Sequence, residues 1–330
     1  MSRVGPEFEQ PGLPPPAQSY SNSVASGGLR QRRLIHEKPV RRRDRFGPYR
    51  MASGVVERFH TFRVRYRDYL AEFFGTLVLV FFGNGVGATV TLFPMASETA
   101  SWVLVSFGWG FALTMGIFVA GGVSGGHLNP AITTTAFLLR GFPFRKVPGY
   151  ILMQFLGAFC GAGLIFGLFK PSLDDFDGGD RQISGPQGTA QIFATYPQPY
   201  MTVGWAFLAE SYCTAALVVC IYAILDEKNM PGTRYAPIAI GLVVTTISMC
   251  IGFQTGFAIN PARDLGPRLL SLAASYGPET FTAFDHYAWV PAVAPFLGAL
   301  VGGLAYDFFI NHPRDVENRA AEEEEVVENY

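Results

Sequence analysis

The sequence predicts an all-α membrane protein with six transmembrane helices and two half-helices arranged as an inverted repeat. Three observations support this. Only 15% of the residues are charged, whereas soluble domains carry roughly a quarter. Two Asn-Pro-Ala segments, starting at Asn129 and Asn260, lie 131 residues apart between long apolar stretches. An Ala-Glu pair that opens an apolar stretch at Glu72 recurs at Glu210, with an offset of 138 residues.

The six predicted spans are long apolar segments with few charges. Each reaches the ~20 residues that a helix needs to cross ~30 Å of hydrocarbon. Helices in soluble cores usually end sooner. The segments are 69–93, 102–123, 147–169, 202–225, 235–254 and 287–310.

Two shorter helices are predicted between spans two and three and between spans five and six. Asn followed by Pro marks a helix start, because Asn caps the first turn and Pro fits the first helical position. Asn129-Pro130-Ala131 and Asn260-Pro261-Ala262 therefore begin two helices, which run to Leu139 and Leu270. Each is about ten residues, or ~15 Å. Two of them end to end match one bilayer core.

The Glu72 and Glu210 segments open corresponding spans in the two halves of the chain. Three spans separate them, so the second half enters the membrane with opposite polarity. Such an inverted repeat places the functional site near the bilayer midplane. Glycines within the spans, such as Gly157 and Gly161, indicate close helix packing, either within the chain or between subunits.

The chain ends differ in composition from the apolar middle. Residues 1–67 are predicted to be a disordered basic cytosolic tail, since they are rich in Pro, Ser and Gly and hold nine Lys or Arg between Arg30 and Arg50. Those charges favour a topology signal over an anionic-lipid contact. Residues 68–310 form the membrane domain, with repeats at 68–170 and 201–310. Residues 311–330 are predicted to be an acidic cytosolic tail. The Lys/Arg bias of the short loops places both termini in the cytosol, and the plasma membrane is the expected location.

The paired half-helices predict a pore with a central barrier to cations. The Asn129 and Asn260 amides would donate to the oxygen of a passing solute, and both helix dipoles point their positive ends at the same place. Arg263 is an intramembrane cation and hence a functional candidate. The alternative for Arg263 is a structural ion pair with Asp264.

The segments that approach the two motifs are predicted to be non-helical and to line the pore with carbonyl oxygens. Glu72 and Glu210 are expected to accept the N–H groups of these loops, with a proton relay as the alternative. A packed, hydrogen-bonded His127 is favoured over a gate or a metal ligand. The predicted lining residues are Gly125, Gly126, His127, Gly256, Phe257 and Ala258.

No sequence feature indicates catalysis, a cofactor, a metal site or nucleic-acid binding. The four cysteines lie in apolar runs without metal-ligand spacing. The sequence contains no pattern typical of a P-loop, a zinc site or a nucleophile elbow. We therefore expect neither an enzyme nor a metalloprotein.

Together, the six spans, the inverted repeat and the two Asn-Pro-Ala segments resemble the aquaporin (major intrinsic protein) family over about residues 69–310. Residues 256–267 (Gly-Phe-Ala-Ile-Asn-Pro-Ala-Arg-Asp-Leu-Gly-Pro) and 195–199 (Thr-Tyr-Pro-Gln-Pro) resemble its glycerol-facilitator branch. This resemblance implies the aquaporin-like right-handed bundle, a homotetramer with one pore per subunit, and structural support from Asp264.

The resemblance also implies an outer selectivity filter of Trp109, Ser248, Phe257 and Arg263. Water-only members usually place His at the position of Ser248 and a small residue at that of Phe257, so this chain has the reverse arrangement. The implied function is a passive channel for glycerol, water, and urea or other small neutral polyols, which excludes protons and ions. The alternatives are a water-selective channel and, less favoured, a proton- or ion-coupled polyol transporter.

Overall fold

The computed structural model describes residues 53–93, 98–229 and 233–311. All elements assigned in these ranges are helices, and no strand occurs among them. The main helices are α1 (Ser53–Arg65), α2 (Arg67–Leu92), α3 (Glu98–Ser124), α4 (Pro130–Arg140), α5 (Val147–Asp177), α6 (Val203–Leu225), α7 (Ala236–Cys250), α8 (Pro261–Ser271), α9 (Glu279–His286) and α10 (Trp289–Phe309). Short helical turns are η1 (Phe144–Lys146), η2 (Ala190–Ile192), η3 (Thr233–Tyr235), η4 (Gly252–Gln254) and η5 (Leu272–Tyr276).

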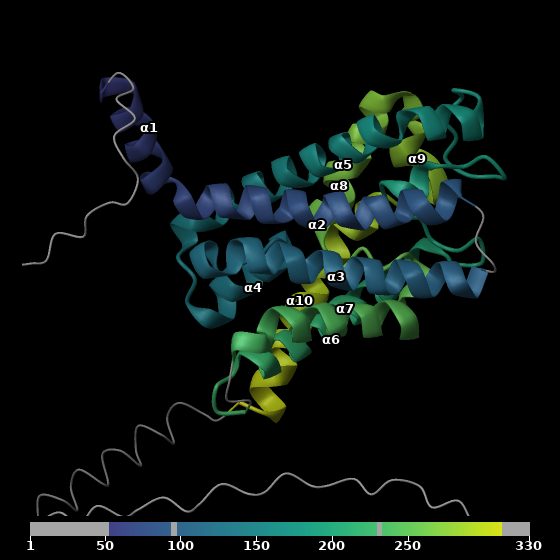
Figure 1. Ribbon diagram of the computed structural model, residues 1–330. Coiled ribbons are helices and arrows are strands. Elements are labelled where there is room, and N and C mark those ends of the chain that lie inside the picture. The colour runs from purple at the N-terminus through teal and green to yellow at the C-terminus, as the bar shows by residue number, and fades with distance from the viewer. Residues whose placement is uncertain (1–52, 94–97, 230–232, 312–330) are drawn as a thin grey trace, which may run out of the picture. The chain divides into compact units, whose positions relative to one another are not determined.

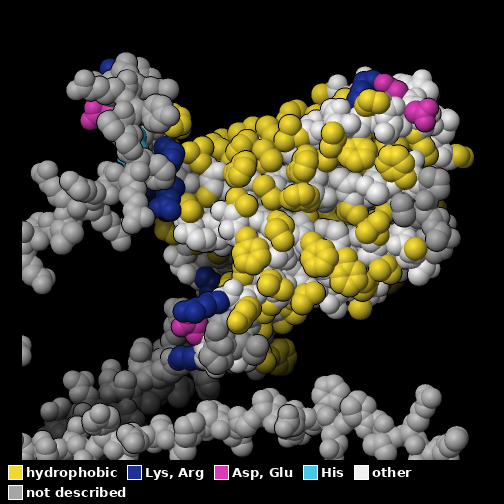
Figure 2. Space-filling view, in the orientation of Figure 1, with side chains coloured by type: hydrophobic (Ala, Val, Ile, Leu, Met, Phe, Trp, Pro, Cys, Tyr) yellow, Lys and Arg dark blue, Asp and Glu magenta, His cyan; other side chains and the backbone are white. Residues whose placement is uncertain are grey.

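Six of these helices correspond to the predicted spans. Within the described ranges, α2, α3, α5, α6 and α10 are long and apolar enough to cross a membrane. The 15-residue α7 is shorter, about 22 Å long at 1.5 Å per residue, and η4 follows it closely. Figure 2 shows an apolar belt on the visible face of the bundle, with charged side chains gathered toward its ends. Polar side chains are instead buried inside, among them Glu72, Asn84, Gln154 and Glu210.

The inverted repeat is visible in the helix packing. In the first half α2 packs against α3 and α5, and in the second half α6 packs against α7 and α10. The closest approaches match: a Cβ added at Gly157 would lie 2.2 Å from the Phe73 carbonyl oxygen, and one at Gly298 would lie 2.2 Å from that of Ser211. Gly157 thus serves packing within the chain, where only a glycine allows the two backbones this close.

The two half-helices bring the halves of the chain together. Helix α4 packs against α10 of the second half, and α8 packs against α5 of the first. Figure 1 shows α4 and α8 within the bundle formed by the long helices. Asn129 caps α4 and Asn260 caps α8, each with Pro at the next position as predicted.

The prediction of disorder over residues 1–67 is wrong for Ser53–Arg65, which form α1. The basic composition of this segment masked a helical spacing of aromatic residues, and no proline interrupts it. Residues 1–52 and 312–330, which include most of both predicted tails, lie outside the described residues.

Helix α5 also extends beyond the predicted end of span three at residue 169. It passes Pro171 and ends at Asp177, where Gly178 adopts a left-handed conformation. Lys170 and Asp174 form an ion pair on its last turns, which are too polar to be read as part of an apolar span.

Candidate functional site

Two cavities enter the bundle and meet at three side chains. The inner cavity, named after the predicted topology, has a volume of about 800 Å³ and contains both capping asparagines in its lining. The outer cavity has a volume of about 790 Å³. Trp109, Phe257 and Arg263 line both. Of the four residues predicted to form the filter, these three are brought together between the cavities.

The N-termini of α4 and α8 are joined by reciprocal hydrogen bonds. Asn129 Oδ1 accepts from the Ala131 N–H at 2.9 Å, while its Nδ2 donates to the Ile259 carbonyl at 2.9 Å. Asn260 Oδ1 accepts from the Ala262 N–H at 3.0 Å, and its Nδ2 donates to the Leu128 carbonyl at 2.7 Å. An amide has two hydrogens to donate. Each asparagine therefore donates one amide hydrogen to the opposite loop and keeps the other for a solute in the cavity. The sequence had predicted that the whole amide group would be free to face the pore.

The two loops that precede the half-helices have an irregular backbone. Several of their residues have positive φ, which is unfavourable for residues other than glycine. This geometry prevents helix formation and leaves backbone groups available to the pore. The loop residues predicted from sequence all line a cavity, with Gly256 in the outer one. The positive-φ residues are Gly125, Gly126, Leu128, Gly256, Phe257 and Ile259.

Glu72 holds the first loop in this conformation. Its Oε1 accepts from Ser124 Oγ at 2.6 Å and from the His127 N–H at 3.0 Å. Its Oε2 accepts from the Leu128 N–H at 2.8 Å and from Gln154 Nε2 at 2.7 Å. The carboxylate is fully buried, and the side chain is not part of either cavity lining.

Glu210 makes the equivalent contacts in the second half. It accepts from the Ala258 N–H at 2.9 Å, the Ile259 N–H at 2.8 Å and Thr255 Oγ1 at 2.5 Å. It is also fully buried and outside both linings. Because donors surround both carboxylates and separate them from the cavities, the geometry favours structural support over a proton relay.

Arg263 lies against the aromatic side of the constriction. Its guanidinium carbon is 3.9 Å from the Trp109 ring centroid and 5.9 Å from that of Phe257. Among the described residues no ion pair joins Arg263 to Asp264. Asp264 instead accepts from Arg268 Nε at 2.8 Å. The alternative of an Arg263–Asp264 ion pair is therefore wrong, and the Arg263 charge faces the constriction.

Ser248 does not line either cavity, although the family resemblance implied that it belongs to the selectivity filter. Its hydroxyl is 2.7 Å from that of Ser106, and its carbonyl accepts from Trp102 Nε1 at 3.2 Å. The family resemblance implies that Ser248 lies on α7, as it does, but the direction of its side chain is determined by Ser106 on the neighbouring α3.

Trp102 is a lining residue that the sequence analysis missed. It borders the outer cavity and meets the Phe257 ring edge-on, with ring centroids 5.8 Å apart. Phe253 packs on its other side at 5.0 Å. Trp102 precedes Trp109 by seven residues, two helical turns, and this spacing was the available signal.

Asp264 and Arg268 anchor the outer loop to α8. Asp264 Oδ2 accepts from both the N–H and the hydroxyl of Thr195 at 2.7 Å. Arg268 donates to the carbonyls of Thr195 and Thr280 at 2.6 and 2.7 Å, and its guanidinium lies 4.7 Å from the Tyr196 ring centroid. Burial raises the pKa of Tyr196 to about 12, so its hydroxyl is neutral at physiological pH. These contacts hold the segment at residues 195–199 in place. The segment, which resembles an outer loop of the glycerol-facilitator branch, borders the outer cavity.

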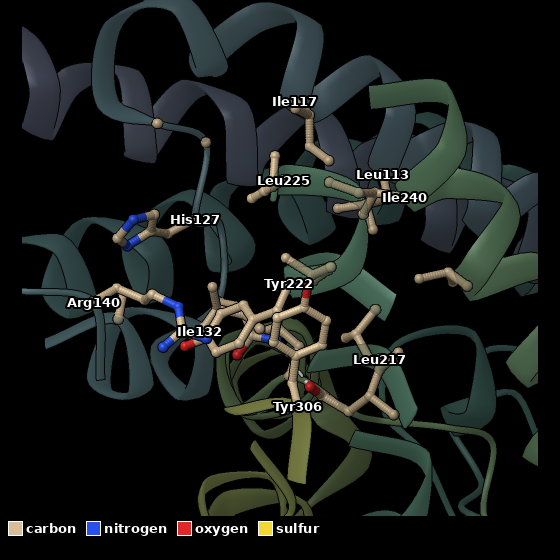
Figure 3. Close-up of a pocket in the computed structure, with 18 of the residues that line it drawn as sticks. Leu113, Ile117, His127, Ile132, Arg140, Leu217, Tyr222, Leu225, Ile240 and Tyr306 are labelled. Carbon is tan, nitrogen blue, oxygen red and sulfur yellow. Dashed lines mark hydrogen bonds between the residues drawn. The ribbon is translucent and has the colours of Figure 1, made fainter. Parts of the chain in front are cut away.

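The inner cavity has one apolar side and one polar side. Figure 3 shows Leu113, Ile117 and Ile240 grouped away from Arg140 and His127. His127 is packed and hydrogen-bonded, with Nδ1 3.1 Å from Thr133 Oγ1 and its ring 4.7 Å from that of Phe142. No group of metal-binding side chains occurs in the ranges that the structure describes.

Arg140 and two tyrosines form the polar side near the mouth of the inner cavity. Arg140 donates two hydrogen bonds to Asp307, at 2.9 and 2.7 Å, and its guanidinium lies 3.8 Å from the Tyr222 ring centroid (Figure 3). The Tyr306 hydroxyl donates to Asp226 at 2.8 Å. This bond, with the backbone N–H of Lys228, holds the pKa of Asp226 below its ordinary value. At this mouth Arg140 is thus paired with Asp307, and Asp226 is held by hydrogen bonds from Tyr306 and the Lys228 backbone.

Comparisons with known proteins agree with this geometry. Residues 59–306 match the family described as major intrinsic protein. Aquaglyceroporin-2 of Rhizophagus irregularis is 48% identical over 246 residues, covering 74% of this chain and 77% of that protein. Aquaglyceroporin-3 of Trypanosoma brucei brucei is 43% identical over 250 residues, covering 76% and 81%. The X-ray structure of the aquaglyceroporin from Plasmodium falciparum superimposes with a TM-score of 0.67 and 34% identity, covering 74% of this chain and 96% of that one.

Proposed function

Because the chain belongs to the major intrinsic protein family, a family of membrane channels, we propose that it is an aquaglyceroporin: a passive channel that conducts glycerol and water. Its relatives in Rhizophagus irregularis and Trypanosoma brucei brucei, and the similar Plasmodium falciparum structure, carry that name. The pore runs from the inner cavity past Asn129 and Asn260 to the outer cavity.

The observation that carries this proposal is the composition of the constriction. Trp109 and Phe257 supply apolar ring surface, and the guanidinium of Arg263, which lies beside both rings, supplies hydrogen-bond donors. Glycerol has a carbon backbone that suits the aromatic rings and hydroxyls that can accept hydrogen bonds from the guanidinium. No histidine occupies position 248, and the Ser248 hydroxyl bonds to that of Ser106, so the side chain at this position does not narrow the passage.

The same residues account for exclusion of ions. The guanidinium of Arg263 places a fixed positive charge in the constriction, and the N-termini of α4 and α8 each contribute roughly half a positive charge near the middle of the membrane. A neutral polyol meets neither barrier, whereas a proton or metal cation meets both.

Stopped-flow light scattering on proteoliposomes tests the proposal. Water permeability is measured under a gradient of an impermeant osmolyte, and glycerol and urea permeability under gradients of each solute. We expect water and glycerol to equilibrate faster than in protein-free liposomes, and urea is tested as a further candidate solute. A water-selective channel would conduct water alone. A coupled transporter would saturate at low glycerol concentration and respond to an imposed proton or ion gradient, whereas an open pore does neither.

The assembly and orientation belong to the same proposal. A homotetramer with one pore per subunit would place the exposed apolar belt against neighbouring subunits and membrane lipids. Both ends of the chain would lie in the cytosol, on the same side of the membrane as Arg145 and Lys146. The protein would reside in the plasma membrane. Native mass spectrometry from lipid bilayers tests the first point, and protease accessibility of terminal tags in intact cells tests the second.

A further inference from the structure

Helix α1 carries an apolar stripe that no other part of the described chain covers. At 100° per residue, Phe59 and Phe62 lie about 60° apart on the helix surface, and Tyr66 directly follows the helix. Phe59 is 65% exposed and Phe62 51% exposed. The opposite side carries Glu57, the exposed Val64 and Thr61, whose hydroxyl bonds back to the Glu57 carbonyl. Such a stripe needs an apolar environment to cover it.

Two arginines flank the stripe. Arg58 and Arg63 lie about 40° beyond its two edges at the same helical spacing, and Arg65 follows near the end of the helix. Arginines beside an apolar face can keep their charged groups at the level of lipid headgroups while the aromatic rings enter the acyl region. The pattern therefore fits an anionic surface that also has an apolar layer beneath it.

The position of α1 puts the stripe at a membrane boundary. Helix α2 starts at Arg67, directly after Tyr66, whose backbone departs from helical geometry. Figure 1 shows α1 turned away from the axis of α2 and clear of the bundle. At this end Asp68 pairs with Lys146 at 2.5 Å, so the span has just left the hydrocarbon.

The stripe is continuous with the aromatic side chains of the bundle at this boundary. The Phe62 and Tyr66 ring centroids are 4.9 Å apart, those of Tyr66 and Tyr69 are 6.3 Å apart, and those of Tyr69 and Tyr150 are 5.7 Å apart. Aromatic rings gather at the interface between lipid and water. Because Tyr150 is buried in the bundle, this series of rings joins α1 to the bundle at the end where α2 begins.

From this arrangement we propose that α1 is a lipid-binding helix that lies on the membrane surface and binds anionic phospholipids through Arg58 and Arg63, with Phe59 and Phe62 inserted below the headgroups. The acidic segment of this chain at Glu322–Glu325 could match the charges. It has no aromatic side chains among its four consecutive glutamates with which to cover the stripe, so an anionic bilayer is the better fit.

Hydrogen–deuterium exchange of the full-length protein in nanodiscs tests the proposal. The nanodiscs contain phosphatidylcholine alone or with about one third phosphatidylserine, the lipid that gives the inner leaflet its negative surface potential. We expect the amides of residues 56–65 to exchange more slowly in the anionic nanodiscs. Each arginine near an anionic surface favours binding by roughly fivefold. The double variant Arg58→Ala/Arg63→Ala should therefore lose roughly 25-fold in binding, with correspondingly faster exchange there.

The matched control removes the same charge elsewhere. Arg145→Ala/Arg234→Ala changes two exposed arginines outside α1 and should leave exchange of residues 56–65 unchanged. Water permeability of the same variants in proteoliposomes reports an intact channel. Equal exchange in the two lipids, or an equal effect of both double variants, overturns the proposal. So does loss of protection after deletion of residues 312–330, since the acidic tail would then be what covers α1.

Discussion

Replacing the buried carboxylate of Glu72 by an amide should loosen the first pore loop by a predictable amount. The Glu72 carboxylate accepts four hydrogen bonds, two of them from the backbone N–H groups of His127 and Leu128. In Glu72→Gln one oxygen becomes an NH₂ group. Ser124 can turn its hydroxyl to the Ala120 carbonyl, but a backbone N–H cannot change its role, so at least one of the two loses its acceptor.

The expected cost follows from the number of unpaired N–H groups. A buried donor without an acceptor costs about 1–3 kcal/mol. Glu72→Gln should therefore destabilise the protein by about 1–3 kcal/mol and Glu72→Ala, which frees both N–H groups, by about 2–6 kcal/mol. At about 2–4 °C per kcal/mol for a domain of this size, the Gln variant should lower the melting temperature by roughly 2–12 °C.

Thermal unfolding of the purified protein measures this effect, and glycerol permeability of proteoliposomes shows whether the pore changes with it. Glu210→Gln should behave in the same way, because Glu210 also holds two backbone N–H groups. The double variant should cost less than the sum, since the two loops share the bonds made by Asn129 and Asn260. An unchanged melting temperature in Glu72→Gln, or strictly additive losses, would refute the reasoning.

Three further predictions concern the constriction and its support. Arg263→Val removes the fixed charge and should raise proton or cation leak in dye-loaded proteoliposomes; an unchanged leak would contradict the role given to Arg263. In Gly83→Ala the new Cβ would lie 2.3–2.5 Å from Trp109 ring atoms, so the indole should shift and glycerol permeability should fall severalfold. Gly85→Ala, with its nearest neighbour at 3.4 Å, is the matched control, and equal loss in both would exclude this explanation. Asp264→Asn breaks a buried ion pair and should lower stability by about 3–5 kcal/mol, measured by thermal unfolding; a wild-type melting temperature would show that the pair is not needed.

The helical architecture could be predicted because bilayer thickness constrains the sequence directly. Span lengths, the two Asn-Pro starts and the offset between Glu72 and Glu210 are all set by the need to cross hydrocarbon with every backbone group satisfied. The contacts of the two glutamates with the loop N–H groups followed from the same need, since non-helical backbone at that depth requires buried acceptors.

Side-chain directions and local helix signals were harder to predict. Ser248 turns to Ser106 on another helix, a choice that no spacing along one helix can encode. The reciprocal bonds of Asn129 and Asn260 join residues more than a hundred positions apart. Helix α1 was missed because composition was averaged over a long basic segment, whereas the Phe59–Phe62–Tyr66 spacing is visible only at single-residue detail.

The mutual fastening of the two half-helices limits how this protein can change shape. Moving α4 away from α8 would break two hydrogen bonds, from Asn129 to the Ile259 carbonyl and from Asn260 to the Leu128 carbonyl. Moving α8 away from α4 would break the same two bonds. The middle of the pore is thus one unit in which the hydrogen bonds between α4 and α8 resist displacement of either half-helix. Any adjustment of flux must then act outside this region, at the entrances of the two cavities, which Arg140 borders on one side and Trp102 on the other.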